Sequence, residues 1–267
     1  MGRPKTKKRR PRLPGVGLRL GTALAVLIAV AGVFYALLRL AGGSPALAEE
    51  AEKPAPTARP TATPAPIPVP TPEPPAVDLS DWKLRLIRYE YPLGEDFVPE
   101  DLTVIEGNER MDGRVAPYMK ELIANARAAG YSVYVCSGYR DYETQSIIYW
   151  RHIYDYQNQG MTYEEADAKT RLAVNYPGCS EHQSGLTADI LEYSTQPMEP
   201  YIGGSGLMLW LEEHCAEYGF VIRYPDGKTD ITGVEYEPWH LRYVGEEAAA
   251  YIMENNLCLE EFLAICR

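Results

Sequence analysis

The chain has 267 residues, enough for one sizeable domain plus accessory segments. Residues 1–48 carry nine Lys and Arg and no Asp or Glu, which leaves 17 of the 26 basic residues against 37 acidic residues in the remainder. That remainder therefore carries a net charge of about −20, which repels phosphates and disfavours binding to nucleic acid. The five cysteines are too few for a disulfide scaffold, and no C-x-x-C pair indicates a cysteine zinc site.

An apolar segment follows the basic N-terminus. Residues 1–19 are basic, and residues 20–38 form an uncharged run that would be about 28 Å long as a helix, close to the thickness of a bilayer's hydrocarbon core. The positive charges before this run predict a cytoplasmic tail, a transmembrane signal anchor and an extracellular remainder. The alternative is a cleaved signal peptide, because residues 46–48 (Ala-Leu-Ala) match the A-x-A pattern of a cleavage site. Either interpretation exports the rest of the chain.

The next segment, residues 39–80, is rich in Ala, Pro and Thr and has ten prolines between residues 54 and 75. Proline fixes φ and lacks a backbone donor, so this segment predicts an extended, semi-rigid extracellular linker. We expect residues 81–267 to form the working domain. Because an external space is oxidising, we also expect one disulfide in that domain, between Cys179 and Cys215.

The first half of this domain predicts two helices and a strand between them. Residues 115–129 have apolar side chains at helical spacing, and Gly130 follows them as a typical helix end. Residues 131–136 alternate and are rich in β-branched and aromatic side chains, which favours a strand. Asp141 is a suitable N-cap for a second helix that runs to residue 154.

The second half continues this mixture of helices and short strands. Thr162 and Glu165 match a capping box that opens another helix. Three further segments predict a strand, an amphipathic helix and a hairpin with a Pro-Asp-Gly turn: residues 186–191, residues 205–218, and residues 220–224 with 237–244. The fold class is α+β, with a small antiparallel sheet flanked by helices.

Two of the four histidines have neighbours that suggest a metal site. His182 precedes a turn at Gly185, and the apolar stretch at residues 186–191 then contains Asp189, a carboxylate that is costly to bury unless it is paired or bound to metal. A catalytic zinc takes three ligands of the N or O type and leaves one position open for water. With His240 as the third ligand, these residues predict such a Zn²⁺ site.

Glu237 lies three residues before His240 and can stand beside the metal-bound water. A carboxylate there can accept the water's proton and deliver it to the leaving amine, while Zn²⁺ lowers the pKa of the water and polarises the scissile carbonyl. Taken alone, each residue also has a plainer interpretation, with His240 as a packed histidine and Asp189 as a loop cap. His152 and His214 lie on helical patterns, and we expect neither to have a role.

Three ordered motifs resemble a known family. They are S-G-Y-R at residues 137–140, S-x-H-x-x-G-x-x-x-D at residues 180–189, and E-x-W-H at residues 237–240. Together they resemble the VanY-type D-alanyl-D-alanine carboxypeptidases, which are zinc metallopeptidases, and their LD-carboxypeptidase relatives. The resemblance covers residues 91–245, and residues 96–102 are similar to the start of the family's domain.

The resemblance implies that His182, Asp189 and His240 bind Zn²⁺ and that Glu237 is the catalytic base. It also implies that Arg140 faces the substrate, where its guanidinium holds a carboxylate or stabilises the developing oxyanion.

Gln145 and Ser180 are further candidates for substrate binding. Gln145 lies one and a half helical turns beyond Arg140 and can point into the same cleft, and Ser180 can contact substrate or orient a metal ligand. Cys179 departs from the family's pattern, and we expect it to alter the loop that carries His182 without removing a ligand.

We therefore expect a monomeric zinc carboxypeptidase that removes the C-terminal D-Ala from peptidoglycan stem peptides. Within the same family, an LD-carboxypeptidase or a peptidoglycan endopeptidase remains an alternative. A non-catalytic wall-binding module with zinc, or a membrane-tethered sensor, represents a different class. Structural zinc sites usually have four protein ligands, whereas the sequence offers three ligands and a base, which favours an enzyme.

Overall fold

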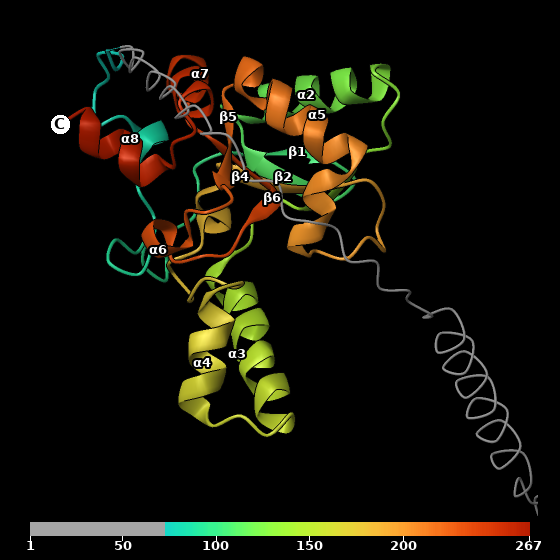
Figure 1. The fold of residues 1–267 in the computed structure, drawn as a ribbon, viewed down its shortest axis with the longest axis vertical. Coiled ribbons are helices and arrows are strands. Elements are labelled where there is room, and N and C mark those ends of the chain that lie inside the picture. The colour runs from blue at the N-terminus through green and yellow to red at the C-terminus, as the bar shows by residue number, and fades with distance from the viewer. Residues whose placement is uncertain (1–72) are drawn as a thin grey trace, which may run out of the picture. The chain divides into compact units, whose positions relative to one another are not determined.

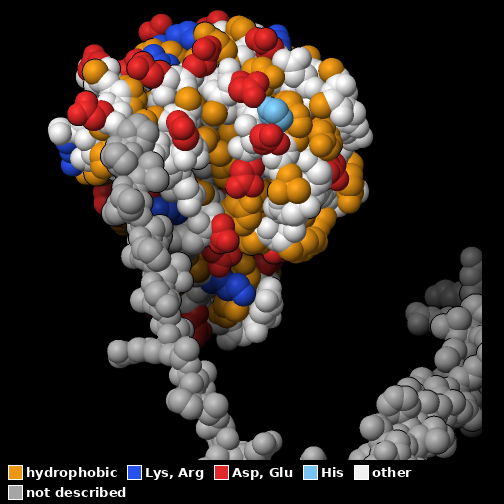
Figure 2. Space-filling view, turned by 45° about the horizontal axis from the view of Figure 1, so that its top comes forward, with side chains coloured by type: hydrophobic (Ala, Val, Ile, Leu, Met, Phe, Trp, Pro, Cys, Tyr) orange, Lys and Arg blue, Asp and Glu red, His pale blue; other side chains and the backbone are white. Residues whose placement is uncertain are grey.

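The computed structural model describes residues 73–267. The predicted cytoplasmic tail, the predicted transmembrane helix and most of the predicted linker lie outside these residues. None of the helices within residues 73–267 is long and apolar enough to cross a bilayer. Figure 2 shows many carboxylates on the face that it displays, in keeping with the acidic composition of the chain after residue 48.

The central feature of the domain is a four-stranded antiparallel sheet, which confirms the predicted α+β class (Figure 1). Its strands follow the spatial order β3 (Tyr134–Ser137), β4 (Thr187–Leu191), β6 (Glu237–Tyr243) and β5 (Phe220–Tyr224). Every residue of β4 and β6 is buried, because these strands lie in the middle of the sheet and both of its faces are covered. A separate hairpin pairs β1 (Leu102–Glu106) with β2 (Glu109–Asp112).

Helices pack around the sheet. Figure 1 shows α3 and α4 side by side as an arm that projects from the rest of the domain. The helices have these bounds: α2 (Ala116–Ala128), α3 (Tyr142–Asn158), α4 (Tyr163–Arg171), α5 (Gly206–His214), α6 (Thr229–Thr232), α7 (Glu246–Glu254) and α8 (Leu259–Ile265). Four 3₁₀ helices complete the described elements: η1 (Trp82–Leu84), η2 (Glu181–Ser184), η3 (Pro200–Gly204) and η4 (Cys215–Tyr218).

The buried apolar residues form separate clusters. The main cluster joins α2 and α5 to the sheet, with Leu122 and Leu207 from these helices and Ile190 and Leu241 from β4 and β6. A second cluster lies between α7, α8 and the neighbouring part of the sheet. The α3–α4 arm has a small cluster of its own around Tyr149. The main core therefore packs α2 and α5 against the sheet, whereas α3 and α4 pack mainly against each other.

Most predicted element boundaries agree with the structure. The helix α2 ends just before Gly130, whose φ of 99° is a conformation that glycine adopts without strain. Asp141 caps α3 by accepting a hydrogen bond from the backbone of Thr144 at 2.7 Å, and α3 runs past the predicted end at residue 154. Thr162 and Glu165 form the predicted capping box of α4.

The predicted pairing of residues 220–224 with 237–244 is confirmed, because β5 and β6 pair antiparallel and residues 225–236, with the Pro-Asp-Gly turn and α6, connect them. Two other predicted elements need correction. The predicted helix at residues 205–218 is divided into α5 and η4, and the strand predicted from residue 131 begins only at Tyr134.

The predicted disulfide between Cys179 and Cys215 is wrong, because all five cysteines are free thiols. Cys215 is buried in the main core cluster, whereas Cys179 lies outside that cluster on the loop before η2. Burial raises the pKa of Cys215 to about 12 and also raises the pKa of Cys179, which disfavours the reactive thiolate form of both side chains.

Candidate metal centre

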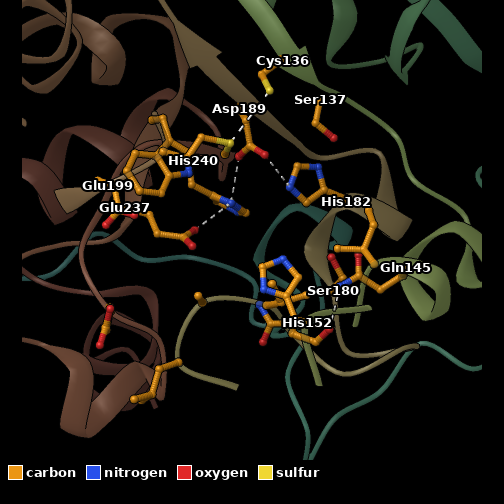
Figure 3. Close-up of a pocket in the computed structure, with 18 of the residues that line it drawn as sticks. Cys136, Ser137, Gln145, His152, Ser180, His182, Asp189, Glu199, Glu237 and His240 are labelled. Atoms are coloured by element: carbon orange, nitrogen blue, oxygen red, sulfur yellow. Dashed lines mark hydrogen bonds and ion pairs between the residues drawn. The ribbon is translucent and has the colours of Figure 1, made fainter. Parts of the chain in front are cut away.

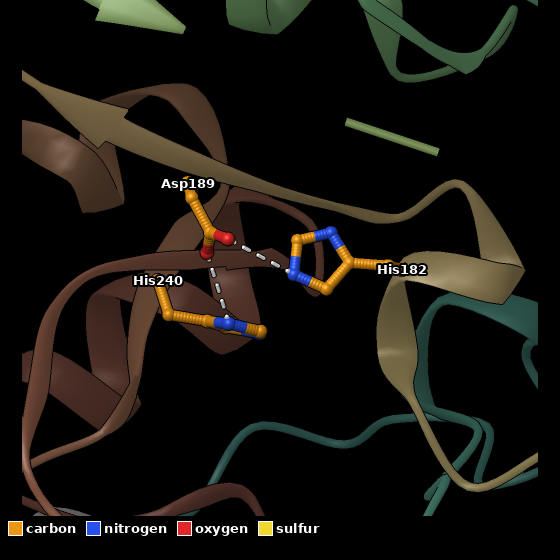
Figure 4. Close-up of side chains that lie close together, drawn as sticks. All are labelled: His182, Asp189 and His240. Atoms are coloured by element: carbon orange, nitrogen blue, oxygen red, sulfur yellow. Dashed lines mark ion pairs between the residues drawn. The ribbon is translucent and has the colours of Figure 1, made fainter. Parts of the chain in front are cut away.

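Two strands and one 3₁₀ helix bring three predicted ligands together (Figure 4). Asp189 in β4 lies directly opposite His240 in β6, and His182 comes from η2. The three donor atoms all lie within 4.8 Å of one another. His182 Nε2 is 3.2 Å from Asp189 Oδ2, and His240 Nδ1 is 3.2 Å from Asp189 Oδ1. Gly185 ends η2 with a φ of 72°, and a Cβ there would lie 2.9 Å from a backbone nitrogen of β2, so the turn requires glycine.

Hydrogen bonds orient both imidazole rings. His182 Nδ1 lies 2.7 Å from the carbonyl oxygen of Gly138, so this nitrogen carries the proton and donates it. The hydroxyl of Thr187 donates to the carbonyl of Leu241 at 2.7 Å, and it therefore accepts from His240 Nε2 at 3.1 Å. These bonds leave Nε2 of His182 and Nδ1 of His240 as the free acceptor atoms, and both atoms face the shared carboxylate.

The electrostatics of the cluster favour a cation. Burial opposes the charge on Asp189, but His182 and His240 outweigh burial and lower its pKa. Burial also disfavours a charge on His240, yet Asp189, Glu181 and Glu237 together raise its pKa well above the usual value. Asp189 Oδ1 is buried and has no hydrogen-bond partner among the described residues. A divalent cation suits this place, since it would satisfy that oxygen and supply the positive charge that the carboxylates stabilise.

Glu237 and Arg140 border the same cluster. Glu237 Oε2 lies 3.3 Å from His240 Nδ1, and burial raises the pKa of Glu237, although His240 partly offsets this effect. Arg140 Nη2 lies 3.7 Å from Asp189 Oδ2. Burial and the positive charge of Arg140 together lower the pKa of His182, which keeps that ring neutral and able to act as a ligand.

Polar side chains hold Arg140 in place. Its Nη1 donates to Oε1 of Gln145 at 2.8 Å, and its Nη2 donates to the hydroxyl of Ser137 at 3.0 Å. Gln145 in turn donates to the backbone carbonyl of Asn175 at 2.6 Å. In the structure Gln145 therefore positions Arg140, in addition to lining the cavity as predicted.

One cavity of about 570 Å³ collects the predicted site residues (Figure 3). They are Arg140, Gln145, Ser180, His182, Asp189, Glu237 and His240. His152, for which the sequence predicted no role, lines the same cavity. His214 lies elsewhere, paired with Glu217 at 2.8 Å.

Sequence reasoning missed Glu181, which supports the site from behind. Its Oε1 accepts hydrogen bonds from Arg223 at 2.7 Å and from Arg242 at 2.6 Å. Burial opposes its charge, but the two arginines lower its pKa well below the usual range. Its Oε2 lies 3.8 Å from His240 Nε2, too far for a hydrogen bond but close enough to stabilise positive charge on that ring. The only signal in the sequence was its place beside His182 inside a motif.

Comparisons with known proteins agree with this geometry. Residues 108–246, more than half of the chain, match the VanY family, described as D-alanyl-D-alanine carboxypeptidase. A D-alanyl-D-alanine carboxypeptidase of Enterococcus faecalis is 40% identical over 186 residues, which are 70% of this chain and 67% of the relative.

Solved structures give the same result. The vancomycin resistance D,D-pentapeptidase VanY from a VanB-type resistance cassette, in complex with Zn(II), is 40% identical with a TM-score of 0.62. The match covers 68% of this chain and 99% of that one. The LD-carboxypeptidase LdcB is 35% identical with a TM-score of 0.59, and the match covers 68% and 86% of the two chains.

The resemblance inferred from the three motifs is thus confirmed, and zinc is the metal that fits the His–Asp–His donor set. The chain belongs to the VanY family of D-alanyl-D-alanine carboxypeptidases, and it is a carboxypeptidase with Zn²⁺ as its cofactor.

Proposed function

We propose that this protein hydrolyses the C-terminal D-Ala from peptidoglycan stem peptides by an acid–base mechanism centred on Glu237. One observation carries the proposal: a carboxylate and a guanidinium, Glu237 and Arg140, border the same cavity as three convergent metal-ligating atoms. This arrangement supplies the parts that metal-assisted peptide hydrolysis requires, namely a metal position, a base and a group for the substrate carboxylate.

His182, Asp189 and His240 would hold the Zn²⁺ ion through Nε2, a carboxylate oxygen and Nδ1. When bound, Zn²⁺ supplies Lewis acidity, which activates a water and polarises the scissile carbonyl. The chain's own contribution is to hold the two rings in fixed tautomers through Gly138 and Thr187, so that the acceptor nitrogens are presented without rearrangement.

Glu237 serves as the general base and then as the general acid. The pKa of Glu237 is raised towards neutral pH. The carboxylate can therefore accept the proton of the attacking water and then return it to the departing amine of D-Ala. Burial causes this shift, and burial also excludes competing water from the carboxylate.

Arg140 binds the terminal carboxylate of the substrate. Nη1 and Nη2 each use one N–H on Gln145 and Ser137, and each nitrogen keeps a second N–H for a ligand. Because the guanidinium is already fixed by these partners, little side-chain entropy is lost when the peptide binds. A free C-terminal carboxylate at this position favours removal of a terminal residue over cleavage inside the stem.

The test uses the zinc-loaded domain with defined stem peptides and mass spectrometry of the products. Release of D-Ala from a pentapeptide supports the proposal, and a zinc-loaded Glu237→Gln variant is the matched control that should be inactive. Conversion of tetrapeptide to tripeptide would instead indicate the LD cut, which the likeness to LdcB keeps as the second candidate. Cleavage of neither peptide by the zinc-loaded enzyme would refute the proposal.

We also propose that the domain works outside the cell as a monomer, held by a membrane anchor at residues 20–38. The uncharged run after eight basic residues supports this topology, and the Pro-rich stretch supports a spacer between anchor and domain. Protease accessibility on intact cells tests the proposed location, and recovery of full-length protein only in the cytoplasm would contradict it.

A further inference from the structure

The cavity continues well beyond the metal centre along one face of α3. Four side chains of this helix line it at spacings of three, four and four residues: Gln145, Ile148, His152 and Tyr156. With a rise of about 1.5 Å per residue, His152 lies about 10 Å and Tyr156 about 16 Å along the helix from Gln145. Gln145 accepts a hydrogen bond from Arg140, the proposed partner of the substrate's terminal carboxylate. Distances along α3 from Gln145 are therefore distances from the end of the cavity where that carboxylate binds.

The far part of this cavity carries positive charge on the α3–α4 arm. Lys169, in the last turn of α4, lines the cavity, and its Nζ lies 4.7 Å from the centre of the Tyr156 ring. This cation–π contact holds the ammonium over the arm, and Nζ forms no ion pair within residues 73–267. The half-buried imidazole of His152 packs edge-on against the same tyrosine, with ring centres 6.3 Å apart.

Two carboxylates, Glu199 and Glu235, also border the cavity. Figure 3 shows Glu199 on the side away from His152, whereas the backbone of Glu235 donates to the carbonyl of Leu172, just after α4, at 2.8 Å. A substrate carboxylate in this region would be repelled by the acidic side chains and attracted by Lys169. A substrate ammonium would have the opposite preference, so the cavity can orient a peptide that carries both charges.

We propose that the far part of the cleft is a subsite for a second substrate carboxylate, on the acyl side of the scissile bond, bound by Lys169 with His152 beside it. This inference rests on the proposed function. An extended peptide covers about 3.4 Å per residue, so 10 to 16 Å from the terminal carboxylate spans about three to five residues, counted with the C-terminal D-Ala included.

In a stem pentapeptide, two groups can provide this carboxylate. One is the α-carboxylate of the γ-linked glutamyl residue at position two, and the other is the side-chain carboxylate of a diamino diacid at position three. Both present the same chemistry to Lys169, and peptides in which each group is separately present or amidated distinguish them.

The experiment measures binding and turnover with four pentapeptides, which combine free or amidated glutamate with lysine or a diamino diacid. Binding is measured by calorimetry on the zinc-loaded Glu237→Gln variant, and kcat/KM on the zinc-loaded enzyme. We expect each effective carboxylate to improve binding and kcat/KM by about three- to five-fold, the size expected for one exposed ion pair, and to lose this effect at high salt. The peptides that show this improvement identify which of the two carboxylates Lys169 binds.

Variants separate this subsite from a general change in charge. Lys169→Gln should abolish the preference for the free carboxylate, and Lys169→Arg should retain it. Lys120→Gln, an exposed lysine on α2 outside the cavity, should leave the preference unchanged. A short N-acetyl-D-Ala-D-Ala substrate, which cannot reach the arm, should be insensitive to all three changes.

Two results would overturn the subsite. One is equal binding of free and amidated peptides by the Glu237→Gln variant, and the other is an undiminished preference in Lys169→Gln. Because the binding measurement needs no catalysis, absence of turnover with all four peptides would refute the proposed function while the calorimetry still decides the subsite.

Discussion

Replacing Glu181 by Gln should destabilise the domain, because this carboxylate neutralises two buried arginines. The side chain of Glu181 is 0% exposed, and its Oε1 accepts from both Arg223 and Arg242. Arg223 keeps a second partner, since it also forms a two-bond pair with Glu260. Among residues 73–267, the other hydrogen-bond acceptors of Arg242 are three backbone carbonyls, so the substitution leaves its charge without a carboxylate there.

The expected loss follows from the cost of an unpaired buried charge. Removing one partner of a buried ion pair costs about 3–5 kcal/mol. Gln keeps the shape and can still accept one hydrogen bond, so we expect a value near the lower end, about 3 kcal/mol. For a domain of about 200 residues, each kcal/mol corresponds to about 2–4 °C, which predicts a fall in Tm of about 6–12 °C.

Urea unfolding of the zinc-free domain measures this loss without the added stability of the bound metal. The matched control is Glu260→Gln, since Glu260 pairs with the same Arg223 from a position that is 10% exposed and leaves Glu181 in place. We expect a clearly smaller loss for the control. A loss below about 1 kcal/mol for Glu181→Gln, or equal losses for both variants, would refute the view that Glu181 neutralises the buried arginines.

Four further outcomes follow from the site. Glu237→Gln should lower kcat by at least about a hundred-fold while the zinc content stays unchanged, and kinetics with metal analysis would expose any turnover that persists. Thr187→Val removes the acceptor for His240 Nε2 and should weaken zinc affinity by about ten- to a hundred-fold in a chelator competition. An unchanged affinity would show that Thr187 does not fix the tautomer of His240. Arg140→Lys should reduce kcat/KM by about ten-fold or more because the fixed fork of donors is lost, whereas an unchanged value would remove Arg140 from carboxylate binding. Since the pKa of His240 is raised in the folded state, the stability that this residue gives the metal-free domain is fully present below about pH 6.5 and is lost as the pH rises through the folded-state pKa. We therefore expect the Tm of the metal-free wild type to exceed that of His240→Asn by less and less as the pH rises from 6 to 9. A growing difference would contradict a raised pKa of His240 in the folded state.

The sequence predicted those parts of the fold whose signals are local. Gly130 and the capping box at Thr162 marked helix boundaries because glycine conformations and cap hydrogen bonds depend on a few adjacent residues. The hairpin of β1 and β2 and the helices α7 and α8 were not predicted. The pairing of β5 with β6 around the Pro-Asp-Gly turn was predicted, whereas the short helix α6 in the same connection was not.

In the candidate site, too, residues with a local sequence signal were predicted and residues that depend on distant contacts were not. His182, Asp189 and His240 could be predicted because the motifs fix their identity and spacing, although nothing local shows that they meet. Glu181 was missed because its role depends on arginines 42 and 61 residues further along the chain. His152 was missed because it lies on a helical face that lines a cavity with mixed polar and apolar side chains, and hydrophobic periodicity does not detect such a face.

The cross-strand register of Asp189 and His240 has a consequence for metal exchange. Main-chain hydrogen bonds of the β4–β6 ladder, rather than the cation, bring these two ligands face to face. Stripping the ion with a chelator should therefore leave the scaffold folded, in contrast to small zinc-dependent domains that unfold when the metal is removed. Metal supply could then switch this hydrolase off and on repeatedly, without a refolding step between the two states.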